Sequence, residues 1–522
     1  MDFLRHPLLA LAGCAVAAVG CERNPSPTPA LSRAADAKPA PSSPPGSGPE
    51  AAVSGQSNAG TTPESGPRIY SRRPRTWIYA EPRRGAARLG YLRAGASVPS
   101  SAASAGTEGC ASGWYPVKPR GFVCSSGATF SPDDPIVRAT RDARPDFSRK
   151  LPYVYGTVRR PGPLYRGLPS TEELASAEPG LEERMATWLS TEGERGASYA
   201  QEVWLGGAGP APDPALLWKE RTTAGVPPFL TPASRLPDFG HADDDDQEEA
   251  PTMRPRAGYS FLKSFVWQGR RYGLTSQLTV APLDRFRPIR GSDFHGVVPG
   301  KDIAFPFAFV RSPKARLWKL EAGKLVNAGA APYRAALKLS GKQKFFRSRL
   351  HYETEDGQWL SDADASRLDP VKRLPGFGKN GEKWLDVNLS KQTLVAYHGD
   401  QAMYATLISS GEAGLEDPEH TTATKRGIFR IHTKHVTSTM SSDEAGEEFE
   451  LRDVPYVQYF DQGYALHGAY WHDRFGIPKS HGCINLSPED ARWLFFFTEP
   501  KVPDGWHGAL LPLTGTVVFV HG

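Results

Sequence analysis

The sequence predicts a mainly β protein built from several small modules. The chain has 522 residues, which is more than a single hydrophobic core usually holds. It contains 52 glycines and 48 prolines, a composition typical of frequent turns and linkers. Short segments of alternating apolar and polar residues recur between these turn residues, whereas clear helix patterns are few. Together these observations favour β modules in series over an α/β or all-helical fold.

Composition and charge exclude three broad classes of protein. The net charge of +5 is too small for a chain of this length to indicate a nucleic-acid partner. With 39% hydrophobic and 10% aromatic residues, the chain has enough apolar side chains to form cores, so it is not disordered throughout. Beyond the N-terminus no run approaches the roughly 20 apolar residues that span a bilayer, which excludes a multi-span membrane protein.

Residues 1–21 have the pattern of a lipoprotein-type signal peptide. Arg5 precedes an apolar stretch from Leu8 to Gly20, which is too short for a stable membrane span. Cys21 follows Ala-Val-Gly and Cys14 follows Leu-Ala-Gly, and both sites resemble a bacterial lipobox. We expect lipidation at Cys21, because cleavage there leaves a signal peptide of more typical length than cleavage at Cys14. Lipidation at Cys14 is the second hypothesis, and secretion without lipidation is the third. A diacylated cysteine would anchor an exported protein to a membrane of the cell envelope, in the periplasm.

Residues 22–66 predict a disordered tether. They contain nine prolines, many Ser, Ala and Gly residues, and no aromatic residue. Such a segment cannot bury enough apolar surface to offset the entropy of ordering it. It would hold the folded part of the chain away from the membrane.

Residues 67–130 predict a small β module. Short strands separated by turn residues are expected at 77–79, 91–92, 114–117 and 121–123. This pattern resembles the bacterial Src-homology-3-like barrel, a common wall-targeting module. Cys110 and Cys124 lie within it, and in an exported protein we expect them to form a disulfide.

Residues 131–375 predict a β-rich accessory region of unassigned function. The best helix candidate runs from Glu172 to Leu189, with an interruption at Pro179-Gly180. Strands are expected at 261–267, 272–275, 303–310 and 347–352, consistent with further small β-barrel modules. The acidic run at 243–249 is interpreted as a solvated loop, although a site for calcium or for a cationic partner is the alternative.

Residues 382–522 predict a β domain with one short helix. Alternating segments are expected as strands at 384–389, 394–397, 402–409, 427–432, 454–460, 464–467 and 515–520. The helix is expected to begin after Ser487 as N-cap, with Pro488 in its first turn, and to extend through Phe497.

This domain also carries the residues suited to catalysis. Cys483 lies among His467, His472 and His481. A thiol becomes a strong nucleophile when a neighbouring imidazole accepts its proton, and on spacing alone His467 and His481 are both candidate bases. Backbone N–H groups around Gly482 and Cys483 are candidate donors to an oxyanion. A zinc site is disfavoured because the cluster contains only one thiolate, so we expect no metal.

The motif Ser-His-Gly-Cys-Ile-Asn at 480–485, preceded by His-Gly at 467–468, resembles the signature of the YkuD-type L,D-transpeptidases. The segments 387–394 and 427–431 resemble flanking strands of that family. One departure is Lys425-Arg426, where the family usually has Thr-Pro. The resemblance covers about 140 residues and implies a C-terminal YkuD-like β-sandwich catalytic domain.

The resemblance also implies a role for each residue. Cys483 would be the nucleophile and His467 the general base and acid. The supporting or substrate-binding residues would be Ser480, His481, Gly482, Asn485 and Trp471, with Trp471 lining the acyl-donor pocket or serving as a core aromatic. His472 is expected to be structural.

The implied function is acyl transfer on peptidoglycan stem peptides, which would serve as donor and acceptor in cell wall biogenesis. Cys483 would form an acyl-enzyme on the tetrapeptide stem and release the terminal D-amino acid, without a cofactor. Two alternatives stay open: a cysteine peptidase or amidase of wall peptides, and a non-catalytic wall-binding scaffold.

Overall fold

The computed structural model describes residues 66–522 except for 142–143, 185, 188–224, 228–229, 232–251, 443–448 and 512–513. The predicted signal peptide, nearly all of the tether and the acidic run at 243–249 therefore lie outside the described residues. Within the described part of the chain, no helix combines the length and apolar character needed to cross a membrane.

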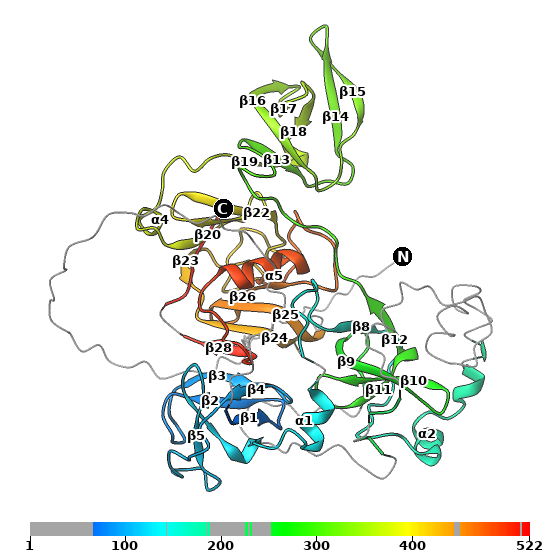
Figure 1. Ribbon diagram of the computed structural model, residues 1–522. Coiled ribbons are helices and arrows are strands. Elements are labelled where there is room, and N and C mark those ends of the chain that lie inside the picture. The colour runs from blue at the N-terminus through cyan, green and yellow to red at the C-terminus, as the bar shows by residue number, and fades with distance from the viewer. Residues whose placement is uncertain are drawn as a thin grey trace, which may run out of the picture. The chain divides into compact units, whose positions relative to one another are not determined.

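The predicted fold class, mainly β, is confirmed (Figure 1). The described strands form sheets of three, five, seven and fourteen strands. The prediction of small closed barrels is wrong, because these sheets are open. In the N-terminal module, one edge of β3 pairs with a C-terminal strand instead of closing a barrel.

The N-terminal module divides its strands between two sheets. They are β1 (Arg68–Ser71), β2 (Thr76–Tyr79), β3 (Arg88–Leu92), β4 (Ser97–Pro99), β5 (Trp114–Pro116), β6 (Phe122–Cys124) and β7 (Ala128–Thr129). β4, β1 and β7 form the three-stranded sheet, and β3, β2, β6 and β5 join the fourteen-stranded sheet. Cys110 and Cys124 form a disulfide, which ties β6 to the preceding loop.

Replacing Cys110 and Cys124 together with serine is expected to destabilise this module by about 3 kcal/mol, because the disulfide closes a loop of 14 residues in the unfolded chain. Denaturant unfolding followed by tryptophan fluorescence measures the change. Peptide mapping of the exported wild-type protein without reductant is the control. Recovery of both cysteines in alkylated form would contradict the prediction.

The middle region adds strands to the same large sheet. Its elements are α1 (Pro135–Thr140), β8 (Val154–Val158), α2 (Thr171–Ala177), β9 (Gly258–Trp267), β10 (Arg270–Thr275), β11 (Val280–Pro282) and β12 (Phe286–Ile289). The expected helix at 172–189 is interrupted as its sequence suggested: α2 ends at Ala177, and Gly180 adopts a positive φ of 66°. Helical backbone resumes at residues 181–184.

A seven-stranded sheet follows. It contains β13 (Phe307–Val310), β14 (Arg316–Glu321), β15 (Lys324–Ala330), β16 (Ala336–Phe346), β17 (Arg349–Thr354), β18 (Trp359–Ser361) and β19 (Ala365–Leu368), and is followed by the short helix α4 (Gly376–Lys379). The strands expected at 303–310 and 347–352 are β13 and β17 with shifted ends. We call residues 307–368 the seven-stranded module.

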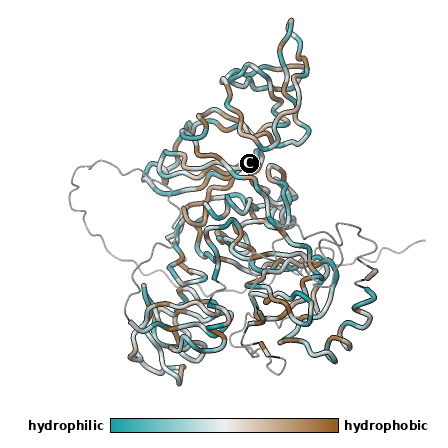
Figure 2. Tube along the Cα trace, turned by 45° about the vertical axis from the view of Figure 1, so that its right-hand side comes forward, coloured by the Kyte–Doolittle hydropathy of each residue, from teal (hydrophilic) through white to brown (hydrophobic). Residues whose placement is uncertain are grey.

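The C-terminal region packs two sheets around one core. The five-stranded sheet contains β20 (Lys383–Asn388), β21 (Thr393–His398), β22 (Gln401–Leu407), β23 (Gly427–Arg430) and β29 (Val517–His521). Facing it are β24 (Thr433–Ser442), β25 (Phe449–Asp461), β26 (Tyr464–Gly468), β27 (Ile484–Leu486) and β28 (Gly508–Leu510). Buried side chains from both sheets share one hydrophobic cluster, and Figure 2 shows hydrophobic segments recurring along these strands.

The helix α5 (Pro488–Phe497) begins where the sequence predicts. The Ser487 hydroxyl accepts a hydrogen bond from the Asp490 N–H at 3.1 Å, and Pro488 occupies the first turn. Ala491, Leu494 and Phe495 pack into the core between the two sheets. This packing fixes the position of β27, which immediately precedes the helix.

Backbone pairing joins the C-terminal sheet to its neighbours. β28 pairs with β3 of the N-terminal module, and β25 pairs with β9 of the middle region. Gly90 is needed at the first junction, because a Cβ there would lie 2.2 Å from the Gly508 carbonyl oxygen. Arg93 adds a buried ion pair to Asp453, 2.5 Å between the nearest atoms. The large sheet therefore extends continuously through three regions of the chain.

Candidate active site

Two short parallel strands carry the candidate catalytic residues. β26 and β27 pair so that Leu466 lies opposite Ile484 and His467 lies opposite Asn485. Side chains alternate between the faces of a strand, so Cys483, two residues before Asn485, falls on the face that carries His467. The other face carries Leu466 and Ile484, which are fully buried in the core. Burial of the apolar face thus directs thiol and imidazole to the same side.

The backbone before Cys483 is shaped by hydrogen bonds to Ser480 and Thr424. The Ser480 hydroxyl donates to the Cys483 carbonyl and accepts from the Gly482 N–H at 3.2 Å. The Thr424 hydroxyl donates to the Gly482 carbonyl at 2.8 Å. Gly482 has a φ of 120°, and a Cβ there would lie 2.9 Å from the Tyr464 ring. A glycine is therefore required both for backbone conformation and for space.

His481 lies apart from the face that carries Cys483 and His467. Its side chain is exposed, and its ring centroid is 5.2 Å from that of Phe449. An extended chain would place His481 and Cys483 on the same side, but the positive φ of Gly482 interrupts the extended backbone between them. The geometry therefore favours His467 over His481 as the partner of the thiol.

Cys483 is the free cysteine among the described residues, and it is half-buried. Its Sγ lies 3.6 Å from the Gly463 carbonyl oxygen. Burial raises the pKa of the thiol to about 11, against an opposing effect of the backbone at Ala465. The resting side chain is therefore a neutral thiol at neutral pH and needs a base to become a nucleophile.

His467 is suited to act as that base. Its side chain is 2% exposed, and burial lowers its pKa to about 4, although a hydrogen bond to the backbone at Gly468 opposes the shift. Nδ1 has no hydrogen-bond partner among the described residues. Nδ1 is therefore a buried nitrogen without a partner in the described part of the chain, and we regard it as the candidate atom to accept a proton.

Trp471 packs beside His467. The two ring centroids are 5.7 Å apart. Trp471 also meets Tyr470 edge to face at 5.1 Å and is partly buried against two hydrophobic clusters. This packing agrees with the expectation of a core aromatic, and the expectation that Trp471 lines the donor pocket stays a prediction.

His472 orients the Asn485 side chain. His472 Nδ1 accepts a hydrogen bond from the Arg474 N–H at 3.2 Å, and His472 Nε2 lies 2.9 Å from the Asn485 amide. Burial lowers the pKa of His472 to about 4, so the ring is neutral at neutral pH. The Asn485 amide nitrogen faces His472 Nε2, and Asn485 Oδ1 is buried without a hydrogen-bond partner within the described chain.

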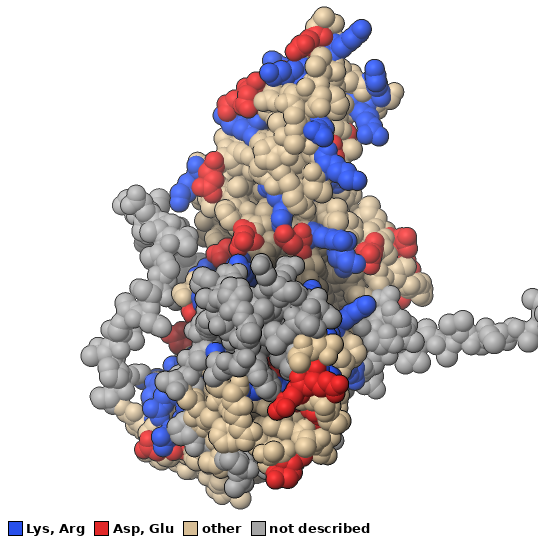
Figure 3. Space-filling view, turned by 90° about the vertical axis from the view of Figure 1, so that its right-hand side faces the viewer, with Lys and Arg blue, Asp and Glu red and all other residues tan. Residues whose placement is uncertain are grey.

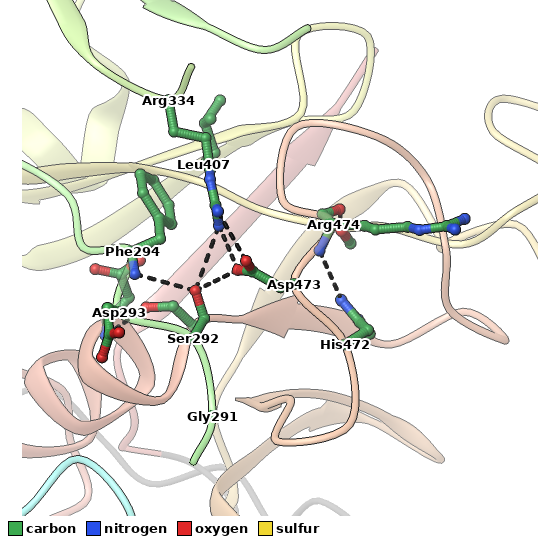
Figure 4. Close-up of polar contacts among 12 residues, drawn as sticks. Gly291, Ser292, Asp293, Phe294, Arg334, Leu407, His472, Asp473 and Arg474 are labelled. Atoms are coloured by element: carbon green, nitrogen blue, oxygen red, sulfur yellow. Dashed lines mark hydrogen bonds and ion pairs between the residues drawn. The ribbon is translucent and has the colours of Figure 1, made fainter. Parts of the chain in front are cut away.

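A charged cluster holds the loop that carries Trp471 and His472 (Figure 4). The Arg334 guanidinium, from the seven-stranded module, donates to both carboxylate oxygens of Asp473, with Nη2 to Oδ2 at 2.8 Å. The Ser292 hydroxyl also donates to Asp473, and it accepts from the Phe294 N–H at 3.0 Å. Hydrogen bonds from Arg334 hold the pKa of Asp473 below its ordinary value. A module distant in sequence thus contacts the candidate active-site loop.

Sequence reasoning did not identify Arg334, Ser292, Thr424 or Asp473 as parts of this site. Arg334 and Asp473 are 139 residues apart, and neither lies in a recognisable motif. His472 was expected to be structural, and its ring contacts the Asn485 side-chain amide.

Comparison with known proteins places the family resemblance in the C-terminal region. Residues 382–520 match the YkuD family model, described as the L,D-transpeptidase catalytic domain. A putative L,D-transpeptidase, YciB from Bacillus subtilis (strain 168), is 29% identical over 128 residues. That match covers 22% of this chain and 61% of the relative, so the chain spans less than two thirds of its length. Residues 382–520 thus resemble the catalytic domain of the L,D-transpeptidases, a family of enzymes.

Solved structures of L,D-transpeptidases also match part of the chain. One is a crystal structure of a mutant of the Enterococcus faecium enzyme, with 25% identity, a TM-score of 0.21, and coverage of 27% of this chain and 50% of that chain. Another is L,D-transpeptidase 3 from Mycobacterium tuberculosis with a faropenem-derived adduct, with 19% identity and a TM-score of 0.21. That match covers 35% of this chain and 78% of the other.

Proposed function

We propose that residues 382–520 catalyse L,D-transpeptidation on peptidoglycan stem peptides through an acyl-enzyme at Cys483. The observation that carries the proposal is the single face formed by Cys483, Asn485 and His467, in which His467 Nδ1 has no hydrogen-bond partner in the described chain. The match of this region to the L,D-transpeptidase catalytic domain supports the choice of reaction.

The first half-reaction forms a thioester. Nδ1 of His467 accepts the proton of the Cys483 thiol as Sγ attacks the carbonyl carbon between the L-centre of diaminopimelate and the terminal D-residue. The Gly482 N–H is already bonded to Ser480, which leaves the Cys483 N–H as the first candidate donor to the resulting oxyanion. Collapse of the intermediate breaks the amide, and the departing amine takes the proton from His467.

The second half-reaction reverses these roles. The amine of a second stem attacks the thioester carbonyl, and His467 accepts the proton released by that amine. Sγ then leaves and recovers the proton, which regenerates the neutral thiol. Trp471 forms a wall beside His467 and is suited to line the donor pocket. The product is a cross-link between two diaminopimelate residues.

Mass spectrometry of disaccharide-tetrapeptide incubated with the protein tests this proposal. We expect loss of the terminal D-residue together with a cross-linked dimer. A hydrolysed stem without dimer would replace the proposal with a peptidase or amidase. Unreacted substrate, together with a thiol that resists acylation, would replace it with a wall-binding scaffold.

The proposed substrate requires a location in the cell envelope. We propose export and lipid anchoring through Cys21, with residues 22–66 as the tether that spans the distance to the wall. All of these residues except Gly66 precede the described part of the chain. Intact mass of the N-terminal peptide and detergent partition would detect the diacyl group.

Replacing Arg334 with methionine is expected to slow acylation of Cys483 on the order of tenfold, because the loop carrying Trp471 and His472 loses its contact at Asp473. The rate of thioester formation with a carbapenem measures the effect. Arg316→Met is the matched control, since Arg316 is an exposed arginine of the same module. Equal rates for Arg334→Met and the wild type would show that the cluster does not position the loop.

A further inference from the structure

The seven-stranded module holds the excess positive charge of the chain. Residues 307–368 contain twelve Lys and Arg residues against six Asp and Glu residues, a net charge of +6, whereas the net charge of the whole chain is +5. Figure 3 shows Lys and Arg side chains gathering over this module. A surface of this kind attracts anionic partners.

Within the module, the hairpin of β16 and β17 combines basic side chains with an exposed aromatic ring. Residues 342–349, which we call the basic hairpin tip, are Lys-Gln-Lys-Phe-Phe-Arg-Ser-Arg and include no acidic residue. The Phe345 side chain is 68% exposed, which makes it the most exposed large apolar side chain among the described residues. An exposed ring among cations calls for a partner that offers both an apolar phase and negative charge.

Strand geometry explains why Phe345 lies in water. Its neighbour Phe346 packs edge to face on the buried Trp359, with ring centroids 5.4 Å apart. Because successive side chains of a strand point to opposite faces, Phe345 faces away from this packing. Across the hairpin it is paired with Leu350, which is itself only half-buried. The fold therefore buries one of two adjacent phenylalanines and leaves the other exposed, although burial of its ring would be favourable.

The turn places a further cation at the end of the hairpin. Arg347 and Ser348 connect the two strands, and both have positive φ, 46° and 64°. Turns of this geometry usually contain Asn or Gly, because most side chains are disfavoured at positive φ. The hairpin thus carries a guanidinium group at its end despite an unfavourable backbone conformation, a combination found at functional sites.

Two arginines of the tip have charges that the module does not neutralise. Lys342 pairs with Glu353 at 3.1 Å. Arg347 and Arg349, in contrast, are exposed and form no ion pair with any described residue. Their guanidinium groups are therefore available to an anionic partner beside the exposed phenyl ring.

We infer that the basic hairpin tip binds the surface of an anionic lipid bilayer, with the Phe345 ring inserted at the boundary between headgroups and acyl chains and with Arg347 and Arg349 paired with lipid phosphates. Guanidinium groups bind phosphate oxygens through two parallel hydrogen bonds. Apolar side chains flanked by cations are stable at this boundary. A soluble polyanion would satisfy the arginines but would leave the phenyl ring in water, so the exposed ring favours a bilayer.

This contact is separate from the proposed reaction and stands whether or not Cys483 is catalytic. It is also separate from the predicted lipid anchor at Cys21. A single anchor on a flexible tether would leave the folded part of the chain free to rotate, whereas a second contact at the hairpin tip would fix its orientation at the membrane.

Co-sedimentation with lipid vesicles tests the inference. The protein used is residues 22–522, which contains every described residue but lacks the predicted signal peptide and Cys21, so that neither can bind lipid. Vesicles of phosphatidylcholine are compared with vesicles that also contain phosphatidylglycerol, an anionic lipid. We expect about tenfold or more tighter binding to the anionic vesicles, and weaker binding at high salt because ions screen the attraction.

Replacing Phe345 tests the apolar part of the contact. Phe345→Ser is expected to weaken binding to anionic vesicles about tenfold, because no ring leaves water on binding. Ile428→Ser is the matched control, since the Ile428 side chain of β23 is 63% exposed and lies outside the seven-stranded module. It is expected to bind like the wild type.

Replacing the arginines tests the ionic part. Arg347→Asn and Arg349→Gln are each expected to weaken binding about fivefold. Asparagine tolerates the positive φ at position 347, so weaker binding of Arg347→Asn reports the lost charge and not a damaged turn. Arg120→Gln, at an exposed arginine of the N-terminal module, is expected to bind like the wild type.

Three outcomes would overturn the inference: equal binding to neutral and anionic vesicles, binding to neither, or wild-type affinity in Phe345→Ser. Wild-type affinity in Phe345→Ser together with weaker binding of the two arginine variants would replace the bilayer with a soluble polyanion as the partner. Because the three substituted side chains are exposed, circular dichroism is expected to show wild-type folding in each variant.

Discussion

Cys483→Ala is expected to abolish turnover of the tetrapeptide substrate, with a loss of about 10³-fold or more. A covalent mechanism has no substitute for its nucleophile, and Cys483 is the free cysteine in the described part of the chain. Mass spectrometry of products and of the acyl-enzyme measures the loss. Because Cys483 is only partly buried, the variant should unfold at a temperature close to that of the wild type. Cross-linking at the wild-type rate by a folded Cys483→Ala variant would refute the acyl-enzyme.

His467→Ala is expected to slow acylation of Cys483 by about 10²–10⁴-fold, the range typical of general-base assistance. His467 lies on the face that carries the thiol and has an unpartnered Nδ1 within the described chain, whereas His481 is exposed beside Phe449. His481→Ala is the matched control and is expected to reduce the rate much less. Acylation by a carbapenem provides the measurement for both variants. A wild-type rate in His467→Ala together with an inactive His481→Ala would reverse the assignment.

The pH dependence of acylation gives an independent test of the same pair. Burial lowers the pKa of His467 to about 4 and raises that of Cys483 to about 11, so both groups are uncharged between these values. Protonation of His467 removes the base as pH falls through about 4, and the thiol ionises only as pH rises through about 11. We therefore expect a nearly constant acylation rate from about pH 5 to about pH 10. A bell-shaped profile centred near pH 7 would indicate a preformed ion pair instead.

Features encoded in short stretches of sequence agree with the structure. The N-cap at Ser487 and the proline after it specify the start of α5, because capping involves only neighbouring residues. Alternating apolar residues predict the strands that contain Leu466 and Ile484, because the side chains of a strand alternate between its two faces and this period of two is visible in the sequence. The motif around Cys483 also contains the glycine that its own backbone conformation demands.

Errors in the predicted fold came from interactions between distant residues. The N-terminal strands were expected to close into a barrel, yet β3 pairs with β28 more than 400 residues later. An edge strand shows no sequence signal for the partner it will meet. The ends of β13 and β17 shifted for a related reason, since strand ends depend on the neighbour across the sheet.

The sequence by itself determined the class of fold, the helix start and the set of residues that carry candidate chemistry. On spacing alone His467 and His481 were both candidate bases, and only the tertiary structure shows how each one lies. His467 is opposite Asn485 in the β26–β27 register, whereas the positive φ of Gly482 interrupts the extended backbone between His481 and Cys483. The tertiary structure also brought Arg334 to Asp473, which lies 139 residues away in the sequence. Local preferences act over a few residues and can be read along the chain. Which side chains lie close together depends instead on which strands pair. Strand pairing is determined by the burial of apolar faces from distant segments against one another.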